Sequence, residues 1–199
     1  MVSGKLKEQF NRWIEAEARL LHNLGLSPNT ISVLGFILSI SSALLYFNWE
    51  RSPSVLPAAG LLLLLSGFFD ALDGAIARTF GIVTVFGGFL DSLLDRYSDA
   101  VVLAAITLSG LCDSFWGFSS LIGSLLVSYS RARAEASGVK MASVGFAERA
   151  ERMLFIALLS FIFPFWAASL WWGIVVLALI THVTVAQRAY YFYKSSRGQ

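Results

Sequence analysis

Residues 70–95 read DALDGAIARTFGIVTVFGGFLDSLLD, and they place four aspartates beside or within apolar runs. Asp70 and Asp73 are three residues apart where one apolar run ends, and Asp91 and Asp95 are four apart near the start of the next. Both spacings put the two members of a pair on one face of a helix. We therefore expect two antiparallel helices that turn these carboxylates toward each other near one membrane surface.

Four converging carboxylates near lipid are costly, by about 2.5–3.5 kcal/mol each, and they repel one another unless a cation neutralises them. Mg²⁺ prefers hard oxygen ligands and bridges to substrate phosphates, and Mn²⁺ suits the same kind of site. The pattern therefore predicts a site for two divalent cations, Mg²⁺ or Mn²⁺. The alternative is that the aspartates are helix-end acids paired with Arg78 and Arg96.

The composition of the whole chain indicates a helical membrane protein. Of its 199 residues 56% are hydrophobic and only 14% are charged, and the mean hydropathy is +0.67. That is too apolar for a soluble domain of this size. The single cysteine, Cys112, excludes an internal disulfide and a cysteine-based metal site. We expect no secretory signal peptide and no nucleic-acid partner; the expected partner is the lipid bilayer.

We predict an all-α, polytopic membrane protein with six transmembrane helices. The expected spans are Ile31–Trp49, Val55–Arg78, Val83–Leu111, Phe115–Arg133, Arg152–Leu170 and Trp171–Tyr193. Ahead of them, residues 3–24 carry apolar side chains at helical spacing opposite a charged face. This favours an amphipathic helix on the membrane surface over a soluble cap helix. The predicted units are a juxtamembrane helix over 1–25 and a six-helix transmembrane domain over 26–199.

The distribution of charge predicts the orientation. With six spans, every Lys and Arg except Arg51 falls on one side of the membrane, which the positive-inside rule makes cytoplasmic. Five tryptophans cluster on the opposite side as an aromatic belt: Trp49, Trp116, Trp166, Trp171 and Trp172. We therefore expect a multi-pass protein of the cell (plasma) membrane whose aspartate layer faces the cytoplasm.

The aspartates also belong to a longer pattern. Together with Gly74, Ala77, Arg78 and Gly87 they read Asp-x2-Asp-Gly-x2-Ala-Arg-x8-Gly-x3-Asp-x3-Asp. This pattern resembles the signature of the CDP-alcohol phosphatidyltransferase family, and the resemblance runs from about Leu26 to Arg188. It implies a membrane enzyme that transfers a phosphatidyl-type group from a CDP-lipid to an alcohol, releases CMP, and commonly forms homodimers.

The resemblance also implies roles for the motif aspartates. In the family the first three aspartates hold two divalent cations, and here these are Asp70, Asp73 and Asp91. The fourth, Asp95, completes the metal site and serves as the general base. A carboxylate near an attacking hydroxyl can remove its proton, while cations bridging a diphosphate neutralise charge on the leaving CMP.

The same resemblance implies that Gly74 and Ala77 border the cytidine. Arg78 is a natural partner for the diphosphate, because its guanidinium offers bidentate donors. Asn29 is a further candidate on the nucleotide side. The alternatives are close packing of small residues between helices for Gly74 and Ala77, and a plain helix cap for Asn29.

Two other segments, SYSRARAEASG and VGFAERAERM, resemble the branch of the family that uses inositol phosphate as the acceptor. In that branch these stretches and a late arginine gather the acceptor phosphate. The positions carried over are Arg131, Arg149 and Arg188, with Arg152 as a fourth candidate. An anionic acceptor also explains a cationic pocket beside an anionic metal site. The alternative is positive-inside charge with salt bridges to neighbouring glutamates.

The reaction that these features predict is transfer of a diacylglycerol- or archaeol-phosphate group from a CDP-lipid to inositol 1-phosphate. The sequence does not distinguish diacylglycerol from archaeol tails. The alternative within the same chemistry is another acceptor, with glycerol 3-phosphate as the first candidate. A cation transporter whose intramembrane acids carry ions is the alternative from another class. It predicts metal flux without CMP release, and it gives no reason for the spacing of Gly74, Ala77 and Arg78.

Overall fold

The computed structural model describes residues 14, 16–21, 23–141, 144–146 and 148–196. Over these residues the chain is all-α. The elements after the N-terminal segment are α2 (Pro28–Phe47), the 3-10 helix η1 (Trp49–Arg51), α3 (Val55–Thr79), α4 (Val85–Leu108), α5 (Ser114–Ala136), α6 (Arg149–Ile162) and α7 (Ser169–Ser196). This confirms the predicted all-α class.

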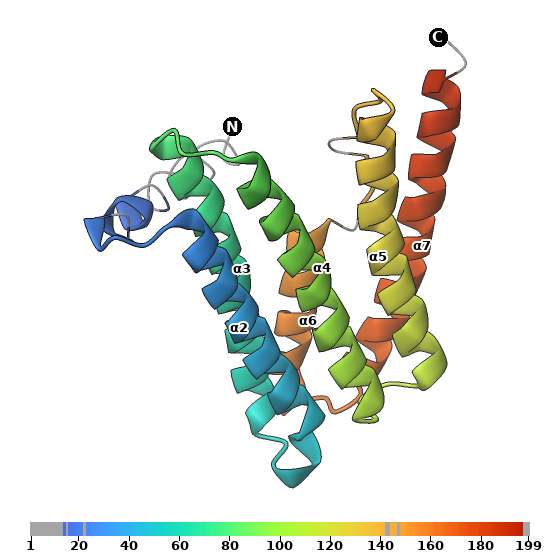
Figure 1. Cartoon of the computed structure of the whole chain (residues 1–199). Helices are drawn as coiled ribbons and strands as arrows, with labels where there is room; N and C mark the ends of the chain where they lie inside the picture. Colours follow the sequence, from blue (N-terminus) through green and yellow to red (C-terminus); the bar gives the residue numbers. More distant parts are fainter. Residues whose placement is uncertain (1–13, 15, 22, 142–143, 147, 197–199) are drawn as a thin grey trace, which may run out of the picture.

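The helices form one antiparallel bundle (Figure 1). α2 packs against both α3 and α4, α5 packs against α4 and α7, and α6 joins the two groups by packing against α3 and α7. The starts of α2 and α4 and the ends of α3, α5 and α7 lie at the upper end of the bundle in Figure 1. We call this the site end, because the motif aspartates lie toward it.

Local sequence signals start the helices at the site end. The Ser27 hydroxyl caps α2 by accepting from the Thr30 amide, with proline at the first helical position. Thr84 caps α4 by accepting from the Gly87 amide at 2.9 Å. Glu148 begins α6 with a capping box. Since α2, α4 and α6 all start toward the same end, their first turns converge on one region.

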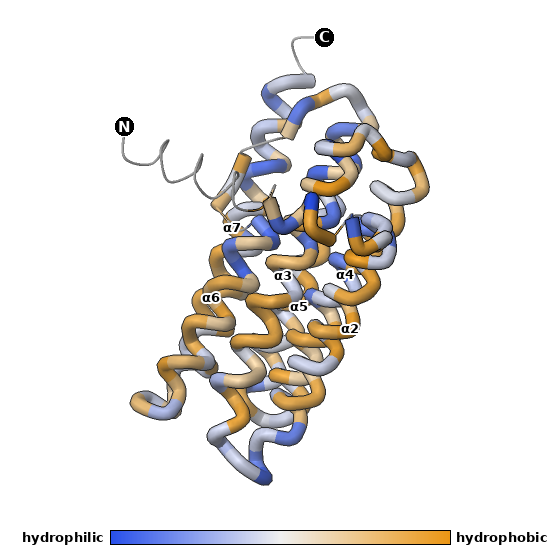
Figure 2. Tube along the Cα trace, turned by 90° about the vertical axis from the view of Figure 1, so that its left-hand side faces the viewer, coloured by the Kyte–Doolittle hydropathy of each residue, from blue (hydrophilic) through white to orange (hydrophobic). Residues whose placement is uncertain are grey.

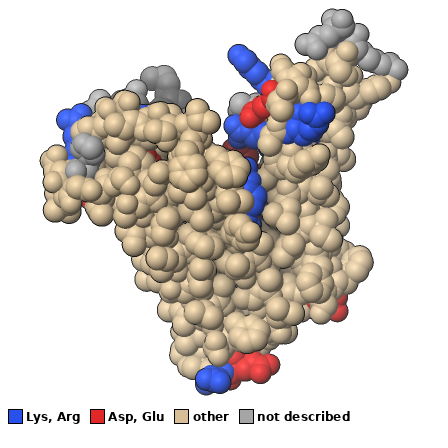
Figure 3. Space-filling view, in the orientation of Figure 1, with Lys and Arg blue, Asp and Glu red and all other residues tan. Residues whose placement is uncertain are grey.

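The surface of the bundle is that of a membrane protein. In the described part of the chain three helices, α2, α3 and α7, are long and apolar enough to cross a membrane. Hydrophobic residues run along most of the length of the helices, and hydrophilic ones gather at the ends (Figure 2). On the face seen in Figure 3 the charged atoms lie near the two ends and in a hollow at the site end.

The predicted boundary between the last two helices is wrong. α6 begins at Arg149 and already ends at Ile162, and α7 begins at Ser169. Pro164 follows the end of α6 and has no amide to continue the helix. The Ser169 hydroxyl donates to the Leu159 carbonyl at 2.9 Å, which ties the connection back onto α6. At about 1.5 Å per residue, the 14 residues of α6 span about 21 Å.

The described part of the N-terminal segment is helical and packs on the bundle. Ile14 and Ala18 are buried together with Leu72 and Ile76 of α3. Their spacing of four agrees with the predicted apolar face. Residues 1–13, which hold most of the predicted amphipathic helix, lie outside the described residues. Its place on the membrane surface stays a prediction.

Aromatic and polar contacts close the opposite end of the bundle. The Trp49 indole donates to the Ser109 carbonyl at 2.8 Å and meets the Phe163 ring edge-on, with centroids 5.7 Å apart. One turn inward, the fully buried Tyr46 hydroxyl lies 2.6 Å from the Ser160 hydroxyl. These contacts connect the ends of α2, α4 and α6 far from the aspartates.

Candidate active site

Three of the four motif aspartates meet at the site end. Carboxylate oxygens of Asp70 on α3 and of Asp91 and Asp95 on α4 all lie within 4.8 Å of one another. Each residue is partly buried. The prediction that the two helices turn these carboxylates toward each other is therefore confirmed. Three carboxylate oxygens at this separation form a donor set of the kind that Mg²⁺ and Mn²⁺ accept.

Asp73 lies beside this group and is held by α2. Its carboxylate accepts a hydrogen bond of 2.5 Å from the Ser32 hydroxyl, and only 5% of the residue is exposed. α2 comes this close because Gly35 has no side chain: a Cβ there would lie 3.2 Å from Phe69 Cβ and 3.3 Å from the Ser66 carbonyl. Helix α2 is thus part of the site.

A cavity of about 550 Å³ opens next to the aspartates. It brings together the residues predicted to bind the nucleotide, Asn29, Gly74, Ala77 and Arg78, with Asp73 and Asp91. The alternative role for Asn29, a helix cap, is wrong, because Ser27 caps α2. The Asn29 side-chain oxygen instead lies 3.1 Å from where a Cβ on Gly87 would be.

Within the cavity the Arg78 side chain folds back over Gly74. Its Nη1 atom lies 2.9 Å from the position that a Cβ on Gly74 would take. Glycine at position 74 therefore leaves the space that the guanidinium occupies. Gly74 and Ala77 line the cavity. The three atoms nearest to the Cβ position of Gly74 all belong to Arg78, on the same helix, so this glycine does not mark a close contact with another helix.

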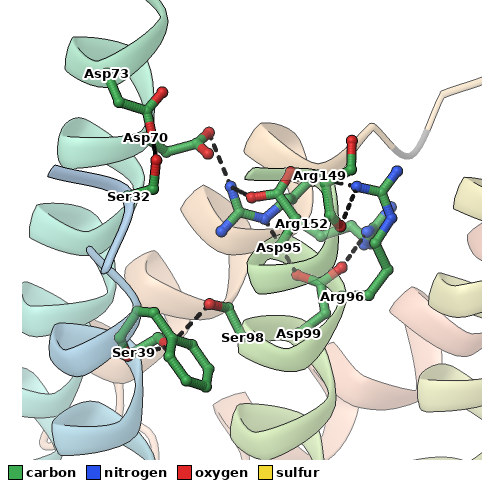
Figure 4. A network of polar contacts seen from close by, with 12 residues as sticks. Ser32, Ser39, Asp70, Asp73, Asp95, Arg96, Ser98, Asp99, Arg149 and Arg152 are labelled. Carbon is green, nitrogen blue, oxygen red and sulfur yellow. Dashed lines mark hydrogen bonds and ion pairs between the residues drawn. The ribbon is translucent and has the colours of Figure 1, made fainter. Parts of the chain in front are cut away.

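Arg149, at the start of α6, lies inside the aspartate group (Figure 4). Its Nη1 atom is 2.8 Å from both the Asp70 and the Asp95 carboxylates. A positively charged group thus already lies between two of the predicted metal ligands. This observation supports the fit of a cation to the site, since the carboxylates are arranged around a positive charge.

A second ion pair lies one helical turn below. Asp99 follows Asp95 by four residues on α4, and its carboxylate accepts a hydrogen bond from Arg152 of α6 (Figure 4). Asp99 is 8% exposed and Arg152 is 3% exposed. Reasoning from the sequence missed Asp99. The repeated spacing of four from Asp91 could have found it, because i, i+4 and i+8 share one helix face.

The other two predicted acceptor arginines lie elsewhere. Arg131, near the end of α5, pairs with Glu135 at 3.0 Å and lies 3.9 Å from Glu148. Arg188 of α7 is 2% exposed, and it donates to the backbone carbonyls of Val127 and Val144. The structure therefore satisfies the buried Arg188 charge with carbonyls, whereas Arg149 pairs with the motif aspartates.

The match to known proteins agrees with this geometry. The family model for CDP-alcohol phosphatidyltransferase matches residues 25–184, which include the motif aspartates and all of the cavity residues named above. The chain belongs to the CDP-alcohol phosphatidyltransferase family. The predicted family is therefore confirmed, and with it the prediction of a membrane enzyme.

Related proteins share most of this chain. An archaetidylinositol phosphate synthase of Pyrococcus horikoshii is 39% identical over 187 residues, which cover 94% of each chain. A phosphatidylinositol phosphate synthase of Mycobacterium tuberculosis is 33% identical over 189 residues, covering 86% of this chain and 81% of that protein. The names of both proteins describe the synthesis of a lipid that carries inositol phosphate.

Solved structures of the Mycobacterium tuberculosis enzyme have the same fold. The structure with CDP-DAG bound superposes with a TM-score of 0.79 at 31% identity, covering 92% of this chain and 94% of that one. The structure in complex with manganese and citrate has a TM-score of 0.78, covering 90% and 88% of the two chains.

Proposed function

We propose that this phosphatidyltransferase moves a diacylglycerol- or archaeol-phosphate group from a CDP-lipid to a hydroxyl of inositol 1-phosphate and releases CMP. The observation that carries the proposal is the juxtaposition of three carboxylates within 4.8 Å with a cavity lined by the motif residues. The names of the relatives support inositol phosphate as the acceptor.

The carboxylate group is proposed to hold divalent cations. Asp70, Asp91 and Asp95 supply the converging oxygens, and Asp73, which lines the same cavity as Asp91, extends the set toward a second ion. When bound, Mg²⁺ or Mn²⁺ neutralises the charge that develops on the leaving CMP. The structure of the related enzyme in complex with manganese supports this choice of metal.

The cavity is proposed to take the CDP group. Gly74 and Ala77 present a helix face without bulk, against which a cytosine ring and its ribose can lie. The Arg78 guanidinium, folded over Gly74, is close enough to reach a diphosphate with paired N–H donors. Asn29, which faces the start of α4, adds an amide to the wall of the cavity.

Asp95 is the proposed general base. The acceptor hydroxyl attacks the lipid-side phosphorus, a new P–O bond forms, and the P–O bond to CMP breaks. Asp95 takes the hydroxyl proton and CMP leaves with the bonding electrons. Asp95 is suited to this role because its carboxylate lies within 4.8 Å of those of Asp70 and Asp91, and its side chain is partly exposed, at 19%.

The acceptor phosphate is proposed to bind among the predicted arginines. Arg149 and Arg131 are the best placed, because Arg131 lies 3.9 Å from Glu148, the residue directly before Arg149. Both reach the site end from different helices. The buried Arg152 and Arg188 add positive charge to the same region. Arg152 is held by Asp99, and Arg188 is held by the Val144 carbonyl.

We also propose the finer membrane arrangement. α4, α5 and α6 cross the bilayer with α2, α3 and α7, which gives six spans in the domain 26–199. Residues 1–25 form a helix on the cytoplasmic surface of the plasma membrane. The site end faces the cytoplasm, as the positive-inside rule requires. The protein works as a homodimer.

CMP release by the purified protein in detergent tests the function. The assay contains Mg²⁺ and either CDP-diacylglycerol or CDP-archaeol, with inositol 1-phosphate, glycerol 3-phosphate, serine or inositol as the acceptor. We expect release with inositol 1-phosphate only. Release with glycerol 3-phosphate instead would keep the aspartate chemistry and refute the acceptor. No release with any pair of substrates would refute the function.

A further inference from the structure

Asp99 contributes a carboxylate to the site that no motif position accounts for. It lies one turn below Asp95 on the same face of α4, inside the bundle. Its partner Arg152 comes from α6. A buried ion pair is a weak source of stability, because desolvation offsets most of the attraction. The place of this pair, directly under the aspartate group, points to a role other than stability.

Arg149 lies between two sets of carboxylates. Its Nη1 atom is 2.8 Å from both Asp70 and Asp95. Its Nε atom is 3.8 Å from the Asp99 carboxylate, an ion pair beyond hydrogen-bond distance. Within the described residues this buried Nε atom has no hydrogen-bond partner. A buried N–H without a partner is costly, and the Asp99 carboxylate at 3.8 Å is an acceptor close enough to satisfy it after a small movement.

The present partners of Arg149 are also the proposed metal ligands. A divalent cation coordinated by the same carboxylates would place a second positive charge close to the Arg149 guanidinium, and the two charges repel. Divalent cations at Asp70, Asp91 and Asp95 therefore compete with Arg149 for the same carboxylates. Moving the Nε atom toward Asp99 by about 1 Å would bring it to ordinary hydrogen-bond distance.

We propose that Asp99 is a positioning residue of the reaction: it anchors Arg152 and receives Arg149 when divalent cations take over Asp70 and Asp95. The inference rests on the proposed metal site. Arg149 is then the counter-ion of Asp70 and Asp95 before the metal binds. After the metal has bound, it stays beside the site as the partner of Asp99. Asp99 stabilises the metal-loaded arrangement through Arg149, without contacting substrate or metal.

Mn²⁺ binding without substrate tests this exchange. The electron paramagnetic resonance signal of free Mn²⁺ gives the affinity of the purified wild-type protein and of the variants Asp99→Asn, Arg149→Gln and the double variant. We expect Arg149→Gln to bind Mn²⁺ about tenfold more tightly, because no cation has to be displaced. Asp99→Asn should weaken binding at least about fivefold more in the presence of Arg149 than in the Arg149→Gln background.

A simple field effect gives a different result. If Asp99 acts on the metal only through its charge, its loss weakens Mn²⁺ binding by the same factor in both backgrounds, and this additivity overturns the proposal. If the wild-type protein binds no Mn²⁺, the proposed metal site fails as well. Mn²⁺ binding with additive effects refutes the exchange alone.

Two further variants control for misfolding and for nonspecific effects of removing a carboxylate. Asp99→Asn leaves the Arg152 charge buried without its carboxylate, which can prevent folding. The same cycle is therefore repeated with Asp99→Asn/Arg152→Gln, which replaces the ion pair by two neutral amides. Asp113→Asn is the matched control, because this carboxylate caps α5 at the far end of α4. It should leave the Mn²⁺ affinity unchanged.

Discussion

Gly74→Ala should make the protein more stable and a poorer enzyme at the same time. Gly74 lies within α3, where alanine is favoured over glycine by about 0.5–1 kcal/mol. The three atoms nearest to the added methyl all belong to the flexible end of Arg78: Nη1 at 2.9 Å, Nη2 at 3.4 Å and Cζ at 3.5 Å. The guanidinium can move away without disturbing the backbone, so folding should gain the full helix preference.

The loss in substrate binding follows from the same distances. A hydrogen bond to a charged group contributes about 1.5–3 kcal/mol, which corresponds to about 10- to 150-fold in affinity. Alanine at position 74 shifts the guanidinium and does not delete it. We therefore expect KM for the CDP-lipid to rise about tenfold, the lower end of that range, with Arg78→Ala showing the larger effect.

The assay pairs thermal unfolding in detergent with CMP release at increasing CDP-lipid concentrations. Gly67→Ala is the matched control, because it lies on the same helix and its Cβ would meet only Met153 atoms at 3.9 Å. It should share the gain in stability and keep KM unchanged. A wild-type KM in Gly74→Ala, or a loss of stability, would refute the reasoning about Arg78.

Three other changes test the site and the bundle. Asp91→Asn should abolish CMP release and leave the temperature of thermal unfolding unchanged. Full activity in this variant would contradict the metal assignment. Arg188→Ala should lower stability by about 2–4 kcal/mol in thermal unfolding, because it removes the two hydrogen bonds that the charged guanidinium donates to backbone carbonyls. Arg188→Lys should recover part of the loss, and equal stability of both variants would argue against that reason. Tyr46→Phe removes the hydroxyl that pairs with Ser160 and should cost about 1 kcal/mol, whereas Tyr129→Phe, on an exposed tyrosine, should cost nothing measurable.

The convergence of the aspartates could be predicted because it depends on local geometry. Spacings of three and four residues fix the face of a helix without any knowledge of the rest of the fold. A short turn between α3 and α4 then brings the two faces to the same height. Helix spacing alone did not assign Gly74 and Ala77: the family resemblance implied that they border the nucleotide, and both line the cavity together with Arg78.

The position of Arg149 could not be predicted in this way. It depends on how the connection after α5 returns α6 to the side of α3, and no local pattern encodes that path. The break between α6 and α7 was missed for a different reason. Phe165 and Trp166 in this connection are apolar, so it lacks the polar turn residues that usually mark the end of a helix.

The short α6 helix has a consequence for the membrane around the protein. Its length of about 21 Å falls short of the roughly 30 Å hydrocarbon core, and the connection after it lies higher in the bundle than the one between α2 and α3 (Figure 1). With α6 as a span, the surrounding bilayer has to thin on this side, at a cost for each ångström of hydrophobic mismatch. Vesicles of short-chain lipids should then favour the folded protein over thicker ones, so the lipids that such an enzyme makes would also set the thickness in which it works.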